Sequence, residues 1–228
     1  MQNSLIDAKI LETFIKCDIK SFPVDCAYIV KHLGYRLYKY SELSEEKRNS
    51  CLLVSDESLK LFDSIYYNDH MLPLRIRFSI AHELGHILLD HGDYQDVEKE
   101  AEANYFASHF LAPRMAIHYS CCKNQNDVAK LFRISQEAAR YAFDDYRRWY
   151  RRTITHKMTR FDKSMYAHFY NTDSECFVYS IQKCENCGVE IYNEPYITCK
   201  KCKKITFINF GEDRELIAME NHWLYGSL

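Results

Sequence analysis

The sequence has few of the residues that interrupt regular structure. Its 228 residues include only 4 Pro and 6 Gly, whereas Tyr and Phe are plentiful, with 18 and 13. Hydrophobic residues make up 47% of the chain and charged residues 27%, the balance of a folded globular protein. This composition indicates compact order rather than linkers, and the length suits one larger domain with a small appendage.

The sequence also lacks a strong charge excess and a long apolar stretch. The formal net charge is −2, so no overall field steers the molecule towards nucleic acid or an anionic membrane. No stretch approaches the length of a membrane span. The first 20 residues have neither the basic start nor the uninterrupted apolar run of a signal peptide. We therefore expect a cytoplasmic location.

The ten cysteines do not indicate a disulfide framework, because a chain without an export signal is expected to keep its thiols reduced. Cys184, Cys187, Cys199 and Cys202 form two CxxC pairs separated by eleven residues. Each pair can place two thiolates on one side of a turn, and two pairs complete a tetrahedral site. Four thiolates leave no open coordination position, so we predict a structural zinc, with iron in a rubredoxin-like site as the alternative. The other six cysteines show no ligand spacing and are interpreted as small buried residues.

Strands are expected around these cysteines, at residues 177–182, 189–193 and 205–210. Gly188 follows the first CxxC pair, where a tight turn favours glycine, and Lys203 holds the matching place after the second. The pattern is typical of a zinc ribbon, which at this size could not fold on core burial alone. Three roles are compatible with this ribbon: it could bind a protein substrate, bind nucleic acid, or cover a cleft.

Hydrophobic periodicity predicts an α+β protein in which helices outnumber short strands. Helices are expected at residues 6–15, 24–33, 73–91 and 97–111, and strands at 35–40, 51–55 and 64–68. A short helix, a turn at 133–135 and a second helix capped by Ser135 follow, and the pattern changes to alternating strands from about residue 165. The domains are then 1–160, with a helix-turn-helix-like segment at about 126–150, a linker and zinc ribbon at 161–211, and a tail at 212–228.

The segment "SIAHELGH", residues 79–86, contains the spacing His-Glu-x-x-His on an otherwise apolar helix. His82 and His86 project from adjacent turns and can bind one metal ion, while Glu83 can reach a water molecule bound to that ion. A metal lowers the pKa of this water, and the carboxylate can take its proton and pass it to a leaving amine. The polar side chains of this helix form a single stripe: Arg75, Ser79, His82, Glu83 and His86.

A catalytic zinc needs a third protein ligand, and the following helix offers Glu98, Glu100 and Glu102. Glu100 shares a face with small residues that let another helix approach, so we predict it as the ligand. Asn104, one turn later, would support a ligand histidine by a hydrogen bond. For Glu98 and Glu102 the prediction is a solvated acidic helix start. The metzincin class is excluded because the chain has Leu89 and Gly92 where that class needs Gly and His.

Four segments carry a family resemblance: the entry "FPVDCAYIVKHLGYRL" and the blocks "RIRFSIAHELGHILLDH", "EAEANYFASHFLAP" and "DVAKLFRISQEAARYAF". They resemble the ImmA/IrrE-type zinc metallopeptidases of bacteria and their mobile elements. The resemblance covers most of residues 20–145. It implies a minimal zincin-like core with zinc held by His82, His86 and Glu100, and with Glu83 as the base. The chain departs from the family at "FLAP", where a Leu-Met-Pro-like end is usual, and in its cysteine module.

Members of that family typically cleave a helix-turn-helix repressor, so the resemblance implies an intracellular zinc endopeptidase with one regulatory protein substrate. Together with the zinc predicted at the four cysteines, we expect two zinc ions per chain. The alternative function is a non-catalytic regulator that binds DNA or a toxin–antitoxin-like protein partner. A catalytic site that only a partner or cofactor opens is a third hypothesis. The donor that would stabilise the oxyanion stays unassigned, with His109 and Tyr105 among the candidates.

Residues 147–163 hold seven basic side chains with interleaved aromatic residues. This pattern is compatible with weak nucleic-acid contact. The favoured interpretation is a solvated helix face whose charge is balanced by Asp144, Asp145 and Asp162. Likewise, the helix-turn-helix-like segment has only Gln136 and Arg140 as candidates for reading a DNA groove, so we expect it to pack beside the catalytic core.

Overall fold

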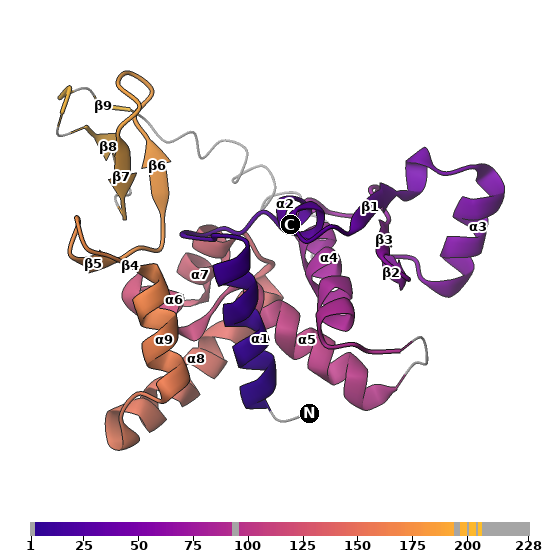
Figure 1. Ribbon diagram of the computed structural model, residues 1–228, viewed down its shortest axis with the longest axis horizontal. Helices are drawn as coiled ribbons and strands as arrows, with labels where there is room; N and C mark the ends of the chain where they lie inside the picture. The colour runs from indigo at the N-terminus through magenta and orange to yellow at the C-terminus, as the bar shows by residue number, and fades with distance from the viewer. Residues whose placement is uncertain (1–2, 93–95, 194–196, 200, 204, 207–228) are drawn as a thin grey trace, which may run out of the picture.

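The computed structural model describes residues 3–92, 96–193, 197–199, 201–203 and 205–206 of the protein. Helices and short strands occur in one chain, so the predicted α+β class is confirmed. Figure 1 shows the strands β6–β9 at one end of the molecule and the small sheet β1–β3 with helix α3 at the other. The helices lie between these two ends.

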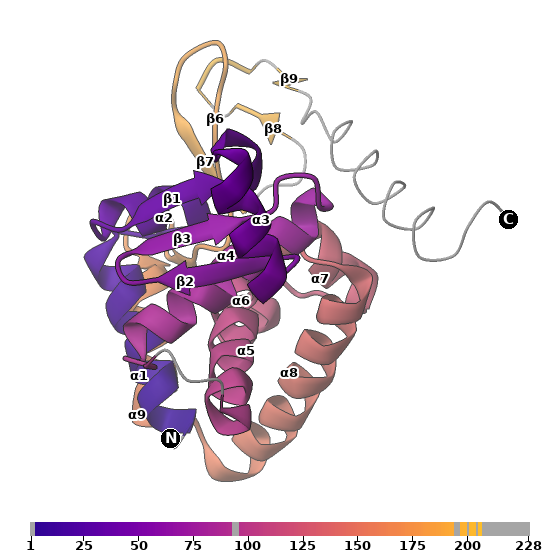
Figure 2. The ribbon, with the colours of Figure 1, turned by 90° about the vertical axis from the view of Figure 1, so that its right-hand side faces the viewer.

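A three-stranded mixed sheet follows the first two helices. Helices α1 (Asn3–Lys16) and α2 (Cys26–His32) precede β1 (Arg36–Lys39), and β2 (Ser58–Leu61) and β3 (Ser64–Tyr67) form a hairpin. The order is β1-β3-β2, with β1 parallel and β2 antiparallel to β3, so β2 is an edge strand. In Figure 2 the three strands lie side by side, and α5 and α8 extend away from them on the same side.

The strand predicted at residues 51–55 is wrong. These residues end helix α3 (Glu45–Val54), which follows the short 3-10 helix η1 (Tyr40–Glu42). Ser44 is the N-cap residue, and two glutamates in the first turn favour a helix start. A short apolar run cannot distinguish helix from strand, and here Leu53 is 88% exposed rather than buried in a sheet. Strand β2, which borders the site described below, was not predicted.

Two long helices pack closely in the centre of the molecule. Helix α4 (Pro73–Leu88) begins with Pro73 in its first turn, as predicted, and ends three residues before the expected stop. Helix α5 (Val97–Leu111) is capped by Asp96, whose side chain accepts from Glu98 N. Gly85 lets the two helices approach, because a Cβ there would lie only 3.1 Å from Cδ1 of Phe106.

Helices α6 (Arg114–Tyr119), α7 (Gln125–Phe132) and α8 (Gln136–His156) follow. The predicted turn and cap are confirmed: Arg133 has a left-handed φ of 50°, and the Ser135 side chain accepts from Ala138 N. Helix α9 (Arg160–Phe169) was not predicted as a helix. Thr159 and Asp162 form a capping box at its start, and Met165 and Phe169 join the main core, so the first part of the predicted 161–211 segment packs against the larger domain.

The remaining strands are short antiparallel pairs. They are β4 (Tyr170–Asn171) with β5 (Cys176–Phe177), β6 (Ile181–Lys183) with β7 (Glu190–Tyr192), and β8 (Ile197–Thr198) with β9 (Ile205–Thr206). Strands β5, β6, β7 and β9 overlap the predicted ribbon strands, with the strand expected at 177–182 divided between β5 and β6. Strands β4 and β8 were not predicted. The predicted tail 212–228 lies outside the described residues.

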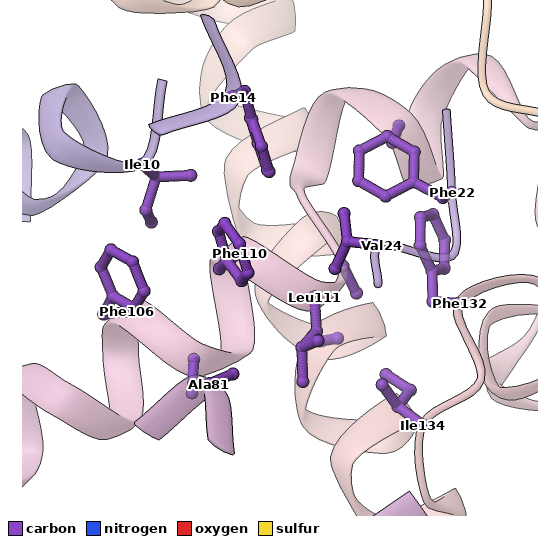
Figure 3. Packing of buried hydrophobic residues seen from close by; sticks show 14 of the residues in the cluster. Ile10, Phe14, Phe22, Val24, Ala81, Phe106, Phe110, Leu111, Phe132 and Ile134 are labelled. Carbon is purple, nitrogen blue, oxygen red and sulfur yellow. The ribbon is translucent and has the colours of Figure 1, made fainter. Parts of the chain in front are cut away.

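Aromatic side chains fill the main core, as Figure 3 shows. Phe14 of α1 stacks on Phe110 of α5 with ring centroids 5.2 Å apart, and Phe110 stacks on Phe106 at 5.3 Å. Phe22 and Phe132 meet edge to face at 5.3 Å. Burial of these rings joins α1, α5 and α7, which are far apart in the sequence. Among the described helices, none is long and apolar enough to cross a membrane.

Candidate metal centre

The polar stripe predicted for α4 faces a cleft of about 1150 Å³. The cleft is bounded by α4, by strand β2, by one face of α5 and by the first half of α8. Every residue of the stripe lines it: Arg75, Ser79, His82, Glu83 and His86. The apolar faces of α4 are buried, so these five polar groups face the cleft, whereas Arg77 points away from it and donates to backbone carbonyl oxygens of Val24, Phe132 and Arg133.

Glu100 completes a group of three potential metal ligands. Its Oε2 lies 3.2 Å from His82 Nε2 and its Oε1 lies 3.3 Å from His86 Nε2, while the two Nε2 atoms are 3.0 Å apart. The ligand atoms all lie within 4.8 Å of one another, so the close packing of α4 on α5 brings the three predicted ligands together. The Glu100 side chain is 44% exposed, because it faces the cleft rather than the core.

The protonation states of His82 and His86 are those that a metal ligand needs. Asn104 Oδ1 lies 3.0 Å from His82 Nδ1. An amide oxygen only accepts, so Nδ1 of His82 carries the proton and Nε2 keeps its lone pair. Burial, and next the proximity of His82, lower the pKa of His86 to about 4, so this imidazole is neutral at pH 7. Imidazole nitrogens and a carboxylate that converge in this way are typical ligands of zinc.

Glu83 lies beside this group but is not one of its ligands. Its side chain is buried, and its Oε1 accepts a hydrogen bond of 2.8 Å from Ser58 Oγ on β2. Burial raises the pKa of Glu83, whereas the Ser58 hydrogen bond lowers it. A carboxylate with a raised pKa next to a metal site is suited to accept a proton from water.

The prediction for Glu102 is wrong. Its side chain is buried, and Oε2 lies 3.0 Å from His91 Nε2. His91 is also buried, and its Nδ1 lies 3.0 Å from His86 Nδ1. The sequence contained a signal that was not used, since Glu102 shares the buried face of α5 with Phe106 and Phe110 at intervals of four residues.

Two of the candidates for an oxyanion donor, Tyr105 and His109, are engaged in other contacts. The Tyr105 hydroxyl donates to Asp7 Oδ1 at 2.9 Å and accepts from Arg114 Nη2 at 2.9 Å. His109 has Nε2 at 3.0 Å from Asp145 Oδ2 and Nδ1 at 2.8 Å from the carbonyl oxygen of Tyr105. Both side chains line the cleft, but these contacts tie α5 to α1, α6 and α8.

Residues 41–144 match the Peptidase_M78 family, described as an IrrE N-terminal-like domain. This range contains His82, Glu83, His86 and Glu100. This part of the chain is therefore similar to the Peptidase_M78 family. No curated protein matches the chain. The matched range begins within η1 and stops within α8, so it contains most of the residues that line the cleft and leaves the four predicted cysteine ligands outside.

Outside the Peptidase_M78 domain, the four predicted cysteine ligands lie within 4.8 Å of one another. The Sγ atoms of Cys184 and Cys202 are 3.6 Å apart, and those of Cys187 and Cys199 are 3.4 Å apart. The two turns match. Gly188 N donates to Cys184 O at 2.8 Å with φ +70°, and Lys203 N donates to Cys199 O at 2.7 Å with φ 57°. Two equivalent turns with four converging thiols fit a tetrahedral metal site.

Proposed function

We propose that this protein is a cytoplasmic zinc endopeptidase that cleaves one regulatory protein, a helix-turn-helix repressor of a mobile element or stress response. The observation that carries the proposal is the convergence of His82, His86 and Glu100 beside the buried Glu83, within a Peptidase_M78 domain. A metal site that only stabilises the fold does not need a carboxylate base beside its ligands.

His82, His86 and Glu100 would hold the catalytic zinc. Zinc bound there supplies Lewis-acid polarisation of a substrate carbonyl and acidifies a water molecule. Glu83 would take a proton from the attacking water and pass it to the amine that leaves when the peptide bond breaks. Ser58, on the neighbouring strand β2, holds Oε1 of Glu83 in place by its hydrogen bond. The substrate peptide would bind in the cleft. A second zinc, held by the four cysteines, would stabilise the ribbon.

The substrate is tested by co-expression with the repressor encoded beside the gene, followed by mass spectrometry of new protein N-termini. We expect one cleavage with the wild-type protein and none with Glu83→Gln, which should keep its zinc. Glu98→Gln is the matched control, because it makes the same change on the exposed start of α5. Cleavage that persists in Glu83→Gln would refute the mechanism, and an intact repressor would refute the substrate.

A second candidate function is DNA binding by the α8–α9 surface, meaning the exposed basic residues Arg147, Arg148, Arg151, Arg152, Lys157, Arg160 and Lys163. Two of the acids expected to balance them are engaged wholly or mainly by other residues. Asp162 is buried and accepts from Trp149 Nε1 at 3.1 Å, and Asp145 is bound by Arg114 and His109 as well as by Arg148. This leaves a cationic surface that suits phosphate groups.

If this surface binds DNA, a short duplex should bind with an affinity that falls steeply as the salt concentration rises. The Glu83→Gln variant should bind the duplex as tightly as the wild-type protein. Replacing Arg147, Arg151 and Arg152 by Gln should abolish this binding, whereas the same change at three other exposed cations should not: Lys16, Lys31 and Lys47. Equal loss in both triple variants would refute the assignment to this surface.

A further inference from the structure

A line of buried polar groups leads from the core of the protein to the candidate metal centre. Glu102 Oε2 lies 3.0 Å from His91 Nε2, and His91 Nδ1 lies 3.0 Å from His86 Nδ1. The Glu102 and His91 side chains are 11% and 3% exposed. The other ring nitrogen of His86 faces Glu100 and His82. His86 is therefore the only member of this line that reaches the ligand group.

The chemistry of each atom along the line fixes where the protons lie. A carboxylate only accepts, so His91 must donate to Glu102 from Nε2. A neutral His91 then has a lone pair at Nδ1, and the proton between the two rings belongs to Nδ1 of His86. With its proton on Nδ1, His86 keeps a lone pair on Nε2, the atom that faces the other ligands.

We propose that Glu102 and His91 are positioning residues that hold His86 in the tautomer able to bind metal. The inference rests on the metal site of the proposed function but not on peptide hydrolysis. Without Glu102, His91 could reverse its hydrogen bond, and His86 would then carry its proton on Nε2 and lose its lone pair there. The negative charge of the Glu102 carboxylate, acting through the His91 ring, also makes Nε2 of His86 a stronger ligand for a metal ion.

The other ligand histidine has a different support, which makes the proposal specific. His82 is held by the neutral amide of Asn104 in a single direct hydrogen bond. His86 is held by a charged group that acts through a second imidazole. Glu102 lies on the core side of α5 and Glu100 on the cleft side, so this one helix supplies both a ligand and the support of another ligand.

The test compares metal affinity in Glu102→Gln with the wild-type protein and with Glu98→Gln. Glutamine has the shape of glutamate but can donate as well as accept, so it fits the same space without imposing the direction of the hydrogen bonds. Zinc is titrated by competition with a chelator into protein whose cysteine site is already filled. We expect Glu102→Gln to weaken zinc binding about 10- to 100-fold and Glu98→Gln to leave it unchanged.

A second readout observes the tautomer of His86 directly. Nitrogen-15 NMR of the histidine rings, with only the cysteine site filled, should show the wild-type His86 proton on Nδ1. Glu102→Gln should show part of it on Nε2, which a change in stability alone would not produce. A wild-type His86 with its proton on Nε2 would overturn the proposal.

The outcomes separate this inference from the proposed function. If the wild-type protein binds no zinc beyond the cysteine site, both the catalytic site and its support are refuted. If the wild-type protein binds zinc and Glu102→Gln binds it as tightly as Glu98→Gln, only the positioning role of Glu102 and His91 is refuted. Loss of affinity with retained thermal stability would support the positioning role.

Discussion

The Ser58 hydroxyl on the edge strand β2 donates to Glu83 Oε1 on helix α4 at 2.8 Å. Both side chains are buried, at 7% exposure each. The contact joins the small sheet to the helix that carries the metal ligands, at the residue proposed as the base. A buried carboxylate is costly to the fold unless hydrogen-bond donors reach it, so we expect the two residues to depend on each other energetically.

Replacing Ser58 by Ala should lower the free energy of unfolding by about 1–3 kcal/mol, because a buried acceptor loses its donor. The same replacement in a Glu83→Ala background should cost much less, since no carboxylate remains to be satisfied. Urea unfolding of the four proteins, with the cysteine site filled throughout, measures this coupling. Equal costs in the two backgrounds would show that the hydrogen bond contributes nothing to the fold.

Metal analysis should find about two zinc ions per chain. The combined change His82→Ala and His86→Ala should remove one and leave the ribbon folded, because the two ligand groups share no residue. The change Cys199→Ser should remove the other and unfold the ribbon, which depends on its metal. A single zinc that is lost only with Cys199→Ser would contradict the histidine site.

Gly85→Ala tests how closely α4 must approach α5. Alanine favours a helix over glycine by about 1 kcal/mol, but the new methyl group would lie 3.1–3.3 Å from three Phe106 atoms. Phe106 is fully buried and cannot move aside easily. We expect a net destabilisation of about 1 kcal/mol and weaker zinc binding, because overpacking pushes Glu100 away from the histidines.

The added change Phe106→Leu should restore part of both losses. Thermal unfolding and zinc titration of the single and double variants check this. A Gly85→Ala protein that is more stable and binds zinc normally would show that the helix interface can open without effect on the site.

Asp145 should make the fold sensitive to acid. Burial alone would raise its pKa, but the hydrogen bond from His109 and the Arg114 guanidinium lower it well below the usual value. The folded-state pKa therefore lies below that of the unfolded chain, about 3.9. The ionised carboxylate stabilises the fold above that pH, and this stabilisation is lost as the pH falls towards the folded-state pKa.

Asp145→Asn should cost about 3 kcal/mol at pH 7, because Arg114 and His109 lose their charged partner. The difference from the wild-type protein should shrink below about pH 4. The pKa of Asp7 is raised by burial and changes stability in the opposite direction, so the comparison of these two proteins isolates Asp145. Asp144→Asn, an exposed neighbour on α8, is the control, and a difference that does not change with pH would contradict the assignment.

Much of the local structure could be predicted because it depends on neighbours in the sequence. The polar stripe of α4, the Ser135 cap and the matched turns at Gly188 and Lys203 each follow from spacing within a few residues. The strand expected at 51–55 failed for the same reason, since a four-residue apolar run fits helix and strand equally well. Helix α9 was missed because its capping box lay in a segment interpreted by its charge.

The sequence alone determined which residues could bind metal, through two histidines one turn apart and a glutamate on the next helix. Only the tertiary structure decided what surrounds them. Ser58 reaches Glu83 from a strand that was not predicted, and Glu102 turns to His91 across the interface of two helices. Such contacts depend on the distance between two packed elements. The periodicity of residues within one element carries no information about that distance.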